Sequence, residues 1–373
     1  MKKTLIAALA AAAIVPAGRA SAQSADKLQL SDYVQSAKLS GDIRLRHDAQ
    51  LGTAGRGSRN RERFRARLGL TATGEGVTAI LRLASGTGSQ TSANQTEQNQ
   101  FSQKGIYIDL AEVRYAAGDA LTLEGGRMNN PFWSGWESSL VWDPDLNPEG
   151  YAQELKLPYG LFARAGQFPI NESASFANAG PWMFAERVGA TIPLGGATAT
   201  LAVDDNYFTN LRRHPTDAVQ TNFGNTTEPS GLLASRFHVV HGWGSVKGKA
   251  GALPVEVSGG YVDNVADSIG SRRFGFIAGA QVGKASKART WEAAYYYKYL
   301  EADATPANQV DDDFGPGGTN LAGHLVWLAY APKDNVVFKL SYYETRVLGQ
   351  LTSTGFTSSR WMGHMMADAM VKF

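Results

Sequence analysis

The stretch "RNRERFRARLGL", residues 59–70, places an arginine at every second position from Arg59 to Arg67. The intervening positions become apolar from Phe64 to Leu70. At helical period these side chains would spread around the whole surface, whereas at period two they separate into a cationic face and an apolar face. The stretch therefore predicts a strand. A row of guanidinium groups also needs water or acidic partners, so a wet environment is expected on its cationic side.

The same alternation recurs along the chain, for example in "KLSGDIRLRH" (38–47), "TWEAAYYYKYLE" (290–301) and "NVVFKLSYYE" (335–344). Each segment has about the length that a tilted strand needs to cross a bilayer. Sixteen such strands are predicted, and fourteen or eighteen remain open because several segments alternate poorly. The predicted strands are 39–47, 61–72, 77–85, 106–116, 120–127, 151–157, 161–168, 184–192, 197–205, 233–245, 255–263, 273–283, 290–301, 321–331, 336–344 and 359–373.

The connections between these segments alternate in length. Short turns such as "TGEG", "PYG" and "PKDN" follow the even-numbered strands, and long polar loops such as 86–105, 128–150 and 302–320 follow the odd-numbered ones. This pattern is typical of outer-membrane barrels with periplasmic turns and extracellular loops. It predicts an all-β fold, a transmembrane up-and-down antiparallel β-barrel over residues 39–373. A soluble sandwich is the alternative, but the strands that carry an apolar face are too many to share one sandwich core.

The N-terminus has the form of a secretory signal: Lys2 and Lys3, an apolar run over 5–15, and the small-residue site at 20–22. We therefore expect a signal peptide at residues 1–22 and a short periplasmic segment at 23–38. No later segment reaches the roughly 18 apolar residues of a membrane helix. Export to the outer membrane of a Gram-negative-type bacterium is predicted.

Composition excludes several classes of function. The leader carries three of the 36 basic residues and no acid, which leaves 33 basic against 34 acidic residues. A nucleic-acid binder would be expected to show a basic excess. The chain has no cysteine, so neither a disulfide framework nor a thiolate metal site is available.

Several segments together resemble the bacterial outer-membrane family called putative porins. They are "LSGDIRLRHD" (39–48), "RNRERFRARLGL", "LEGGRMNNPF" (123–132), "LVWDPDLNPEGYA" (140–152) and "FGPGGTNLAGH" (314–324). The resemblance implies a closed barrel that conducts small hydrophilic solutes and ions, with no cofactor and no catalysed reaction. It also implies that the last strand, ending in Phe373, is read by the barrel-assembly machinery, and by analogy with general porins it suggests a homotrimer.

The apolar side of residues 59–70 is expected to face lipid, because arginine on that side costs about 2–4 kcal/mol at the bilayer midplane. The arginines then face the lumen, and neighbouring strands extend them into a cationic wall. Its predicted members are Arg44, Arg46, Arg61, Arg63, Arg65, Arg67, Arg82, Arg114 and Arg127. The alternative role for these arginines is to brace the barrel through pairs with acids.

The loop around 128–150 offers four acids, Glu137, Asp143, Asp145 and Glu149. In general porins a loop folds inward and sets acids across from wall arginines, and by resemblance this loop is expected to do the same. The resulting transverse field would orient polar solutes and tune ion selectivity.

Two other functions remain open at this point: an outer-membrane barrel enzyme of the lipase or protease type, and a closed structural barrel or adhesin. No nucleophile elbow or paired zinc-ligand helix occurs in the sequence. "DDDFGPGGTN" at 311–320 could attract a divalent cation, but it lacks the calcium-loop pattern. For the predicted barrel, the expected partners are outer-membrane lipid and small hydrophilic solutes or ions. No nucleic-acid partner is expected.

Overall fold

The computed structural model describes residues 32–53, 57–172, 180–213, 224–267, 270–349 and 361–373. Sixteen long strands and the two-residue β4 (Gln95–Thr96) form one antiparallel sheet. The long strands are β1 (Ser36–Thr53), β2 (Gly57–Gly74), β3 (Val77–Ser85), β5 (Ile106–Ala117), β6 (Leu121–Arg127), β7 (Glu149–Lys156), β8 (Leu161–Pro169), β9 (Trp182–Pro193), β10 (Thr198–Thr209), β11 (His238–Ala250), β12 (Leu253–Asn264), β13 (Phe274–Gly283), β14 (Thr290–Leu300), β15 (Leu321–Lys333), β16 (Val336–Val347) and β17 (Met362–Lys372). The predicted fold and strand count are confirmed.

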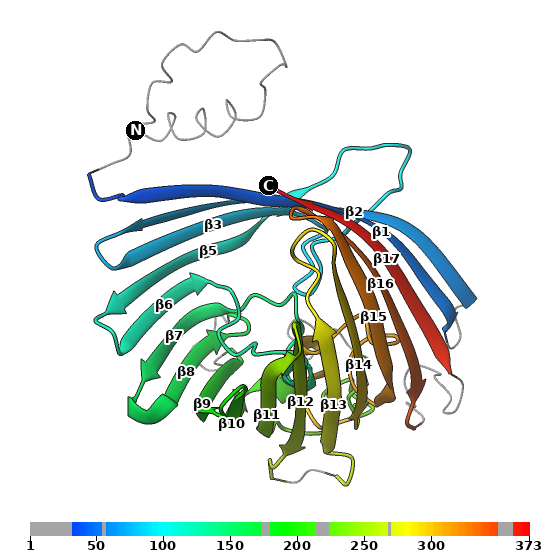
Figure 1. Cartoon of the computed structure of the whole chain (residues 1–373). Coiled ribbons are helices and arrows are strands. Elements are labelled where there is room, and N and C mark those ends of the chain that lie inside the picture. The colour runs from blue at the N-terminus through cyan, green and yellow to red at the C-terminus, as the bar shows by residue number, and fades with distance from the viewer. Residues whose placement is uncertain (1–31, 54–56, 173–179, 214–223, 268–269, 350–360) are drawn as a thin grey trace.

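The sheet closes on itself, because β1 pairs with β2 on one side and with β17 on the other. Figure 1 shows β17 running beside β1. The Gly41 amide donates to the Phe373 carbonyl at 2.8 Å, and the Phe373 amide donates to the Gly41 carbonyl at 3.0 Å. A closed ring has no free strand edge, which is the condition for a sheet in lipid.

The short connections lie at one rim and the long ones at the other. The turn between β2 and β3 uses only Glu75 and Gly76, both with positive φ (47° and 79°), as a tight hairpin between twisted strands requires. Among the residues that the structure describes, four 3₁₀ helices lie in connections: η1 (Trp136–Leu140), η2 (Pro158–Gly160), η3 (Leu211–Arg213) and η4 (Ala307–Gln309). No helix in the described ranges is long and apolar enough to cross a membrane.

Several strand boundaries differ from the sequence prediction, those of β1, β2 and β11 most clearly, and β5 contains a bulge. β1 and β2 are 18 residues each and pair along most of that length, so both extend beyond 39–47 and 61–72. β11 begins at His238 rather than at residue 233. Near residue 111, where the alternation changes parity, β5 carries a bulge: Arg82 pairs with Leu110 and Leu83 with Ile108, so Asp109 is the extra residue.

The two faces of the sheet differ in chemistry. The outer face carries aliphatic side chains, with Leu45 56% and Val188 64% exposed. It also carries a ladder of rings in which Phe274 and Phe276 both stack on Tyr299 at 5.6 Å. Such side chains suit contact with lipid and its interface.

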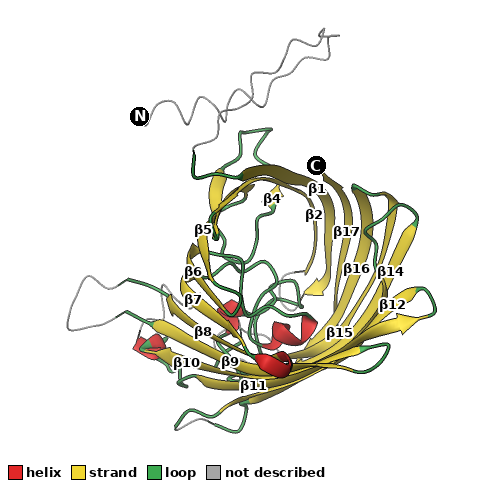
Figure 2. Ribbon diagram, turned by 60° about the vertical axis from the view of Figure 1, so that its left-hand side comes forward, coloured by secondary structure: helices red, strands yellow, loops and turns green. Residues whose placement is uncertain are grey.

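The interior is only partly polar. Figure 2 shows loops and short helices within the ring of strands. Met128, Phe132 and Trp142 from the β6–β7 connection and Phe314 from the β14–β15 connection belong to one buried apolar cluster, which includes inner residues of β7 to β17 such as Trp327. The apolar parts of these two connections therefore pack against the inner residues of β7 to β17.

Candidate functional site: arginine rows and the loops that meet them

Strand register arranges the arginines of β1 and β2 in four rows across the sheet. From the long-loop rim toward the short-turn rim, the rows are Arg61–Asp48, Arg63–Arg46–Asp368, Arg65–Arg44–Met370 and Arg67–Asp42, with the third member of the two middle rows supplied by β17. Like charges thus stand directly opposite each other in both middle rows, which is unfavourable unless acids offset them.

Two aspartates of β1 each bridge two arginines of β2. Asp48 accepts from Arg61 Nη2 at 2.9 Å and from Arg63 Nη1 at 3.1 Å. Asp42 accepts from Arg65 Nη2 at 2.9 Å and from Arg67 Nε at 2.7 Å. The Asp48 side chain is fully buried, so these charge-assisted bonds replace its lost hydration.

The remaining two arginines of the rows have different partners. Arg46 donates from Nε and Nη2 to the two oxygens of Asp368 at 2.7 and 3.0 Å, and its Nη1 lies 3.4 Å from Asp313 of the β14–β15 connection. Arg44 donates to the amide oxygen of Asn94 at 2.7 Å. Within the described part of the chain, Arg44 is the one member of the predicted cationic wall without an ion pair.

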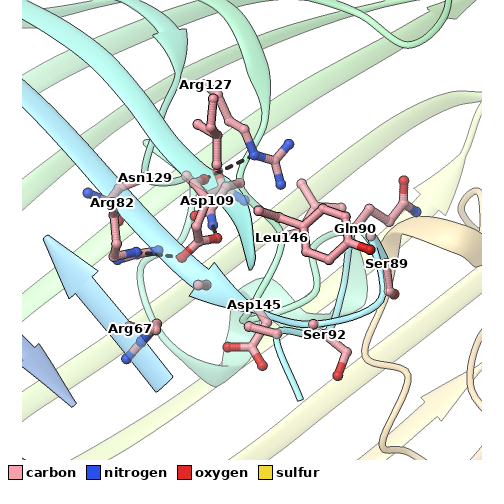
Figure 3. Close-up of a pocket in the computed structure, with 18 of the residues that line it drawn as sticks. Arg67, Arg82, Ser89, Gln90, Ser92, Asp109, Arg127, Asn129, Asp145 and Leu146 are labelled. Carbon is pink, nitrogen blue, oxygen red and sulfur yellow. Dashed lines mark hydrogen bonds and ion pairs between the residues drawn. The ribbon is translucent and has the colours of Figure 1, made fainter. Parts of the chain in front are cut away.

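The bulge residue Asp109 organises a second group of arginines, shown in Figure 3. Its carboxylate accepts from Arg82 Nε at 2.5 Å and from the Asn147 amide at 2.9 Å, and its carbonyl accepts from Arg127 Nε at 3.0 Å. These residues line a cavity of about 810 Å³ between the β2–β6 part of the sheet and the β6–β7 connection. Arg114 pairs instead with Glu112 and Glu124 at 2.7 and 3.0 Å.

The four acids predicted to face the arginines divide into two groups. Glu149 pairs with Arg127 at 2.8 Å, and Asp145 lies 3.9 Å from Arg65 Nη1. Glu137 is buried beside β12, and burial raises the pKa of its carboxyl. Neither Glu137 nor Asp143 makes an ion pair with an arginine among the described residues.

Asp143 instead joins the β14–β15 connection. Its carboxylate accepts from the Asp312 amide at 3.1 Å, and ligand oxygens of Asp143, Asp311 and Asp312 lie within 4.8 Å of one another. Burial and mutual repulsion raise the pKa of Asp143 well above the ordinary value, and burial raises that of Asp311 to about 6. Asp312 lies at the exposed edge of the cluster, where desolvation and repulsion from Asp313 and Asp311 raise its pKa in the same direction. Three carboxylates could hold a divalent cation. The buried ammonium of Lys298 opposes the pKa rise at Asp311 and supplies a counter-charge from within the protein.

The β6–β7 connection is fixed to the far side of the ring by Arg187 of β9. This guanidinium donates to the Phe132 carbonyl at 2.6 Å and to Ser134 Oγ at 2.7 Å, and it pairs with Asp204 of β10. Further along, Trp136 packs on Trp327 with ring centroids 5.3 Å apart. The connection therefore runs from the anchor on β9 to the acids beside β2 and β6.

Sequence reasoning missed most of the acids that contact the arginines: Asp42, Asp48, Asp109, Asp313 and Asp368. A signal existed for two of them, because Asp42 and Asp48 share the parity of Arg44 and Arg46 in "GDIRLRHD". The contacts of Asp313 and Asp368 with Arg46 join residues 267 and 322 positions apart and depend on closure of the ring. Arg187 and Asp204 were also missed, although they lie opposite each other on adjacent strands.

Comparison with known proteins agrees with this architecture. The family model described as "Putative porin" matches residues 53–231 and 198–354. A search of curated proteins found no match. Solved structures share the fold at low identity: Pseudomonas putida OprB at high pH (11% identity, 90% of this chain and 94% of that chain, TM-score 0.58), a mutant of Rh. blastica porin (10%, 91% and 100%, 0.52), and the trimer form of the Vibrio cholerae outer membrane protein OmpT (11%, 91% and 99%, 0.50).

Proposed function

Since the chain belongs to the putative porin family, we propose that it passes small hydrophilic solutes and ions through a lumen lined by the cationic wall. Family and fold make it a porin-like channel rather than an enzyme, in the outer membrane of a Gram-negative bacterium. The observation that carries the proposal is the cavity of about 810 Å³ at Arg67, Arg82 and Arg127, bounded on its other side by Asp145 and Glu149.

The solute route runs between the arginines of β1–β3 and the β6–β7 connection. Arg67 and Arg82 line the sheet side of this space and Asp145 lines the side of the connection, so a dipolar or charged solute meets a field across its path. The connection is held by Arg187 at one end and packed through Trp136, which keeps its acids in place.

The arginines also brace the barrel through ion pairs, and only the charge that these pairs leave unbalanced acts on a solute. Ion pairs hold Arg46, Arg61, Arg63, Arg65 and Arg67 in the sheet. These partners reduce the positive charge that the arginines present to the lumen, but the arginines still outnumber the carboxylates within the rows. A net anion preference is expected from the surplus.

Planar-bilayer recording of the purified protein tests the proposal. Stepwise conductance increments with a reversal potential that favours chloride over potassium are the expected result. Membranes that stay silent after insertion of folded barrels would rule out conduction, and conduction with preference for potassium would rule out the cationic lumen.

A closed structural barrel is the second candidate, because an apolar cluster with Phe132, Trp142 and Phe314 occupies much of the interior. The same recordings decide between the two, since a closed barrel passes no current. The cavity beside Arg82 favours the open channel.

Three further features belong to the proposal. Residues 1–22, outside the described residues, act as the signal peptide. The C-terminal strand ending at Phe373 is recognised by the barrel-assembly machinery. The barrel forms a homotrimer, for which the trimer form of the V. cholerae OmpT structure is the precedent; size-exclusion chromatography with light scattering measures the assembly mass.

A further inference from the structure

We propose that Arg44 is a docking point for small oxyanions, the carboxylate or phosphate groups of solutes in transit. The inference deepens the proposed channel function, because it names the chemical class that the lumen selects and the residue that selects it. It rests on three properties of the Arg44 side chain: its place in the rows, its free donors and its charged neighbours.

The row that contains Arg44 holds no acid. Arg44 lies between Arg65 on β2 and Met370 on β17, whereas the adjacent rows contain Asp42 and Asp368. Arg65 turns toward Asp42 in the next row, with its Nε 3.2 Å and its Nη2 2.9 Å from Oδ1. No carboxylate in the described part of the chain lies within 4.0 Å of the Arg44 guanidinium, so this positive charge is uncompensated at short range.

The guanidinium has donors to offer. One nitrogen, Nη2, is committed to Asn94 at 2.7 Å, and Asn94 is itself held by Ser92 Oγ at 3.2 Å. Nε is shielded from solvent and has no hydrogen-bond partner among the described residues, whereas the Arg44 side chain as a whole is partly exposed. The Asn94 contact fixes the plane of the guanidinium. The guanidinium therefore keeps N–H groups that no protein acceptor takes up, and an oxyanion that reaches its exposed edge can accept from them.

Neighbouring charges favour an anion at this point. Arg65 stands opposite and Arg46 lies two residues away on the same face of β1, so an anion at Arg44 relieves their repulsion. Asp145 of the β6–β7 connection, 3.9 Å from Arg65 Nη1, is the acid that an incoming oxyanion must compete with. Removing that acid is therefore expected to strengthen anion binding.

Equilibrium binding to the full barrel in detergent micelles tests the inference without requiring conduction. The line width of inorganic phosphate is followed by phosphorus NMR and that of the acetate methyl group by proton NMR, as protein is added. For at least one of the two anions, Arg44→Gln is expected to raise the dissociation constant at least about tenfold and Arg44→Lys about threefold, because lysine keeps the charge but loses the fork. Asp145→Asn is expected to lower it.

Two comparison variants remove the same charge elsewhere. Arg61→Gln removes an arginine held by Asp48, and Arg273→Gln removes one that pairs with Asp263 outside the rows. The first should change the dissociation constant less than threefold, and the second should leave it unchanged. If Arg44→Gln does not fold, Arg44→Lys and Asp145→Asn decide the question.

The results of these binding experiments distinguish the oxyanion site from the proposed channel function. Binding of phosphate alone, of acetate alone or of both, weakened selectively by the Arg44 variants, supports the site and tells which group it takes. Absence of binding by the wild-type barrel, or equal losses in Arg44→Gln and Arg61→Gln, overturns it. A barrel that binds phosphate through Arg44 but passes no current would contradict the channel and leave the oxyanion site standing.

Discussion

Arg187 and Asp204 form a two-pronged ion pair inside the barrel, with Nε to Oδ1 2.6 Å and Nη2 to Oδ2 2.8 Å. Both side chains are almost completely buried. Because the same guanidinium also donates to the Phe132 carbonyl, the pair connects strands β9 and β10 to the segment that approaches the arginines. One contact therefore contributes both to the stability of the barrel and to the position of that segment.

Asp204→Asn is predicted to lower the free energy of unfolding by about 3–5 kcal/mol, because it leaves a buried guanidinium without its counter-charge. Urea titration of the barrel in detergent measures the change. Asp263→Asn, which breaks the more exposed pair with Arg273, should cost no more than about 1 kcal/mol. Equal losses in the two variants would show that the buried pair has no special role.

Replacing Arg63 and Arg65 together by glutamine is predicted to shift the reversal potential toward cation selectivity. The reason is that two positive charges are lost while Asp48 and Asp42 remain. The double lysine variant keeps the charge and should retain the wild-type potential. An unchanged potential in the glutamine variant, accompanied by a lower unfolding temperature, would assign these two arginines to bracing alone.

The cluster of Asp143, Asp311 and Asp312 is predicted to make the packing of the two long connections dependent on pH. The folded-state pKa of each is raised above its unfolded value, to about 6 for Asp311, so the folded state holds protons more tightly. Its stability therefore rises as pH falls through about 6 and is lost as pH rises. Unfolding temperatures measured in chelator at pH 5.0 and 7.5 should differ in that direction.

Asp311→Asn should flatten this dependence, because it removes one of the interacting carboxyls. Asp334→Asn is the matched control: Asp334 lies in the exposed β15–β16 turn, where the Ala288 amide lowers its pKa. The stability that the Asp334 carboxylate contributes is complete above its unfolded-state pKa, so it does not change between pH 5.0 and 7.5. A dependence that survives Asp311→Asn would exclude Asp311 as its source.

Asp109→Asn is predicted to increase the preference for anions. The amide can occupy the same bulge, but Arg82 loses the carboxylate that it contacts at 2.5 Å. The chloride-to-potassium permeability ratio should rise, whereas Asp119→Asn, in the exposed turn between β5 and β6, should leave it unchanged. A ratio that is insensitive to Asp109 would mean that ions do not pass this cavity.

The strands could be predicted because their signal is local. Alternation within ten residues and the difference between "TGEG" and the 86–105 loop are both visible without tertiary contacts. The bulge at Asp109 was visible only as a change of parity, because an inserted residue leaves no compositional mark.

The arginines of the site could be predicted from the sequence, whereas most of their acidic partners could not. Alternation placed the arginines together, but their partners follow from register between strands that are distant in sequence, as with Arg46 and Asp368. Asp143 was grouped with Asp145 because both belong to "WDPD". In the structure the turn sends Asp145 toward Arg65 and Asp143 toward Asp312, a difference that loop geometry decides and residue type does not.

The pairing of β1 with β17 has a consequence for how the ring is built. Among the described strands, every other long strand is hydrogen-bonded to its neighbour in chain order, so only this seam requires pairing between strands that are very far apart in sequence. Until the last strand arrives, β1 presents a bare row of amides and carbonyls that any extended chain could occupy. Sealing of the seam is thus the step at which this polypeptide is most exposed to mispairing, and destabilising it should slow assembly more than loosening any hairpin.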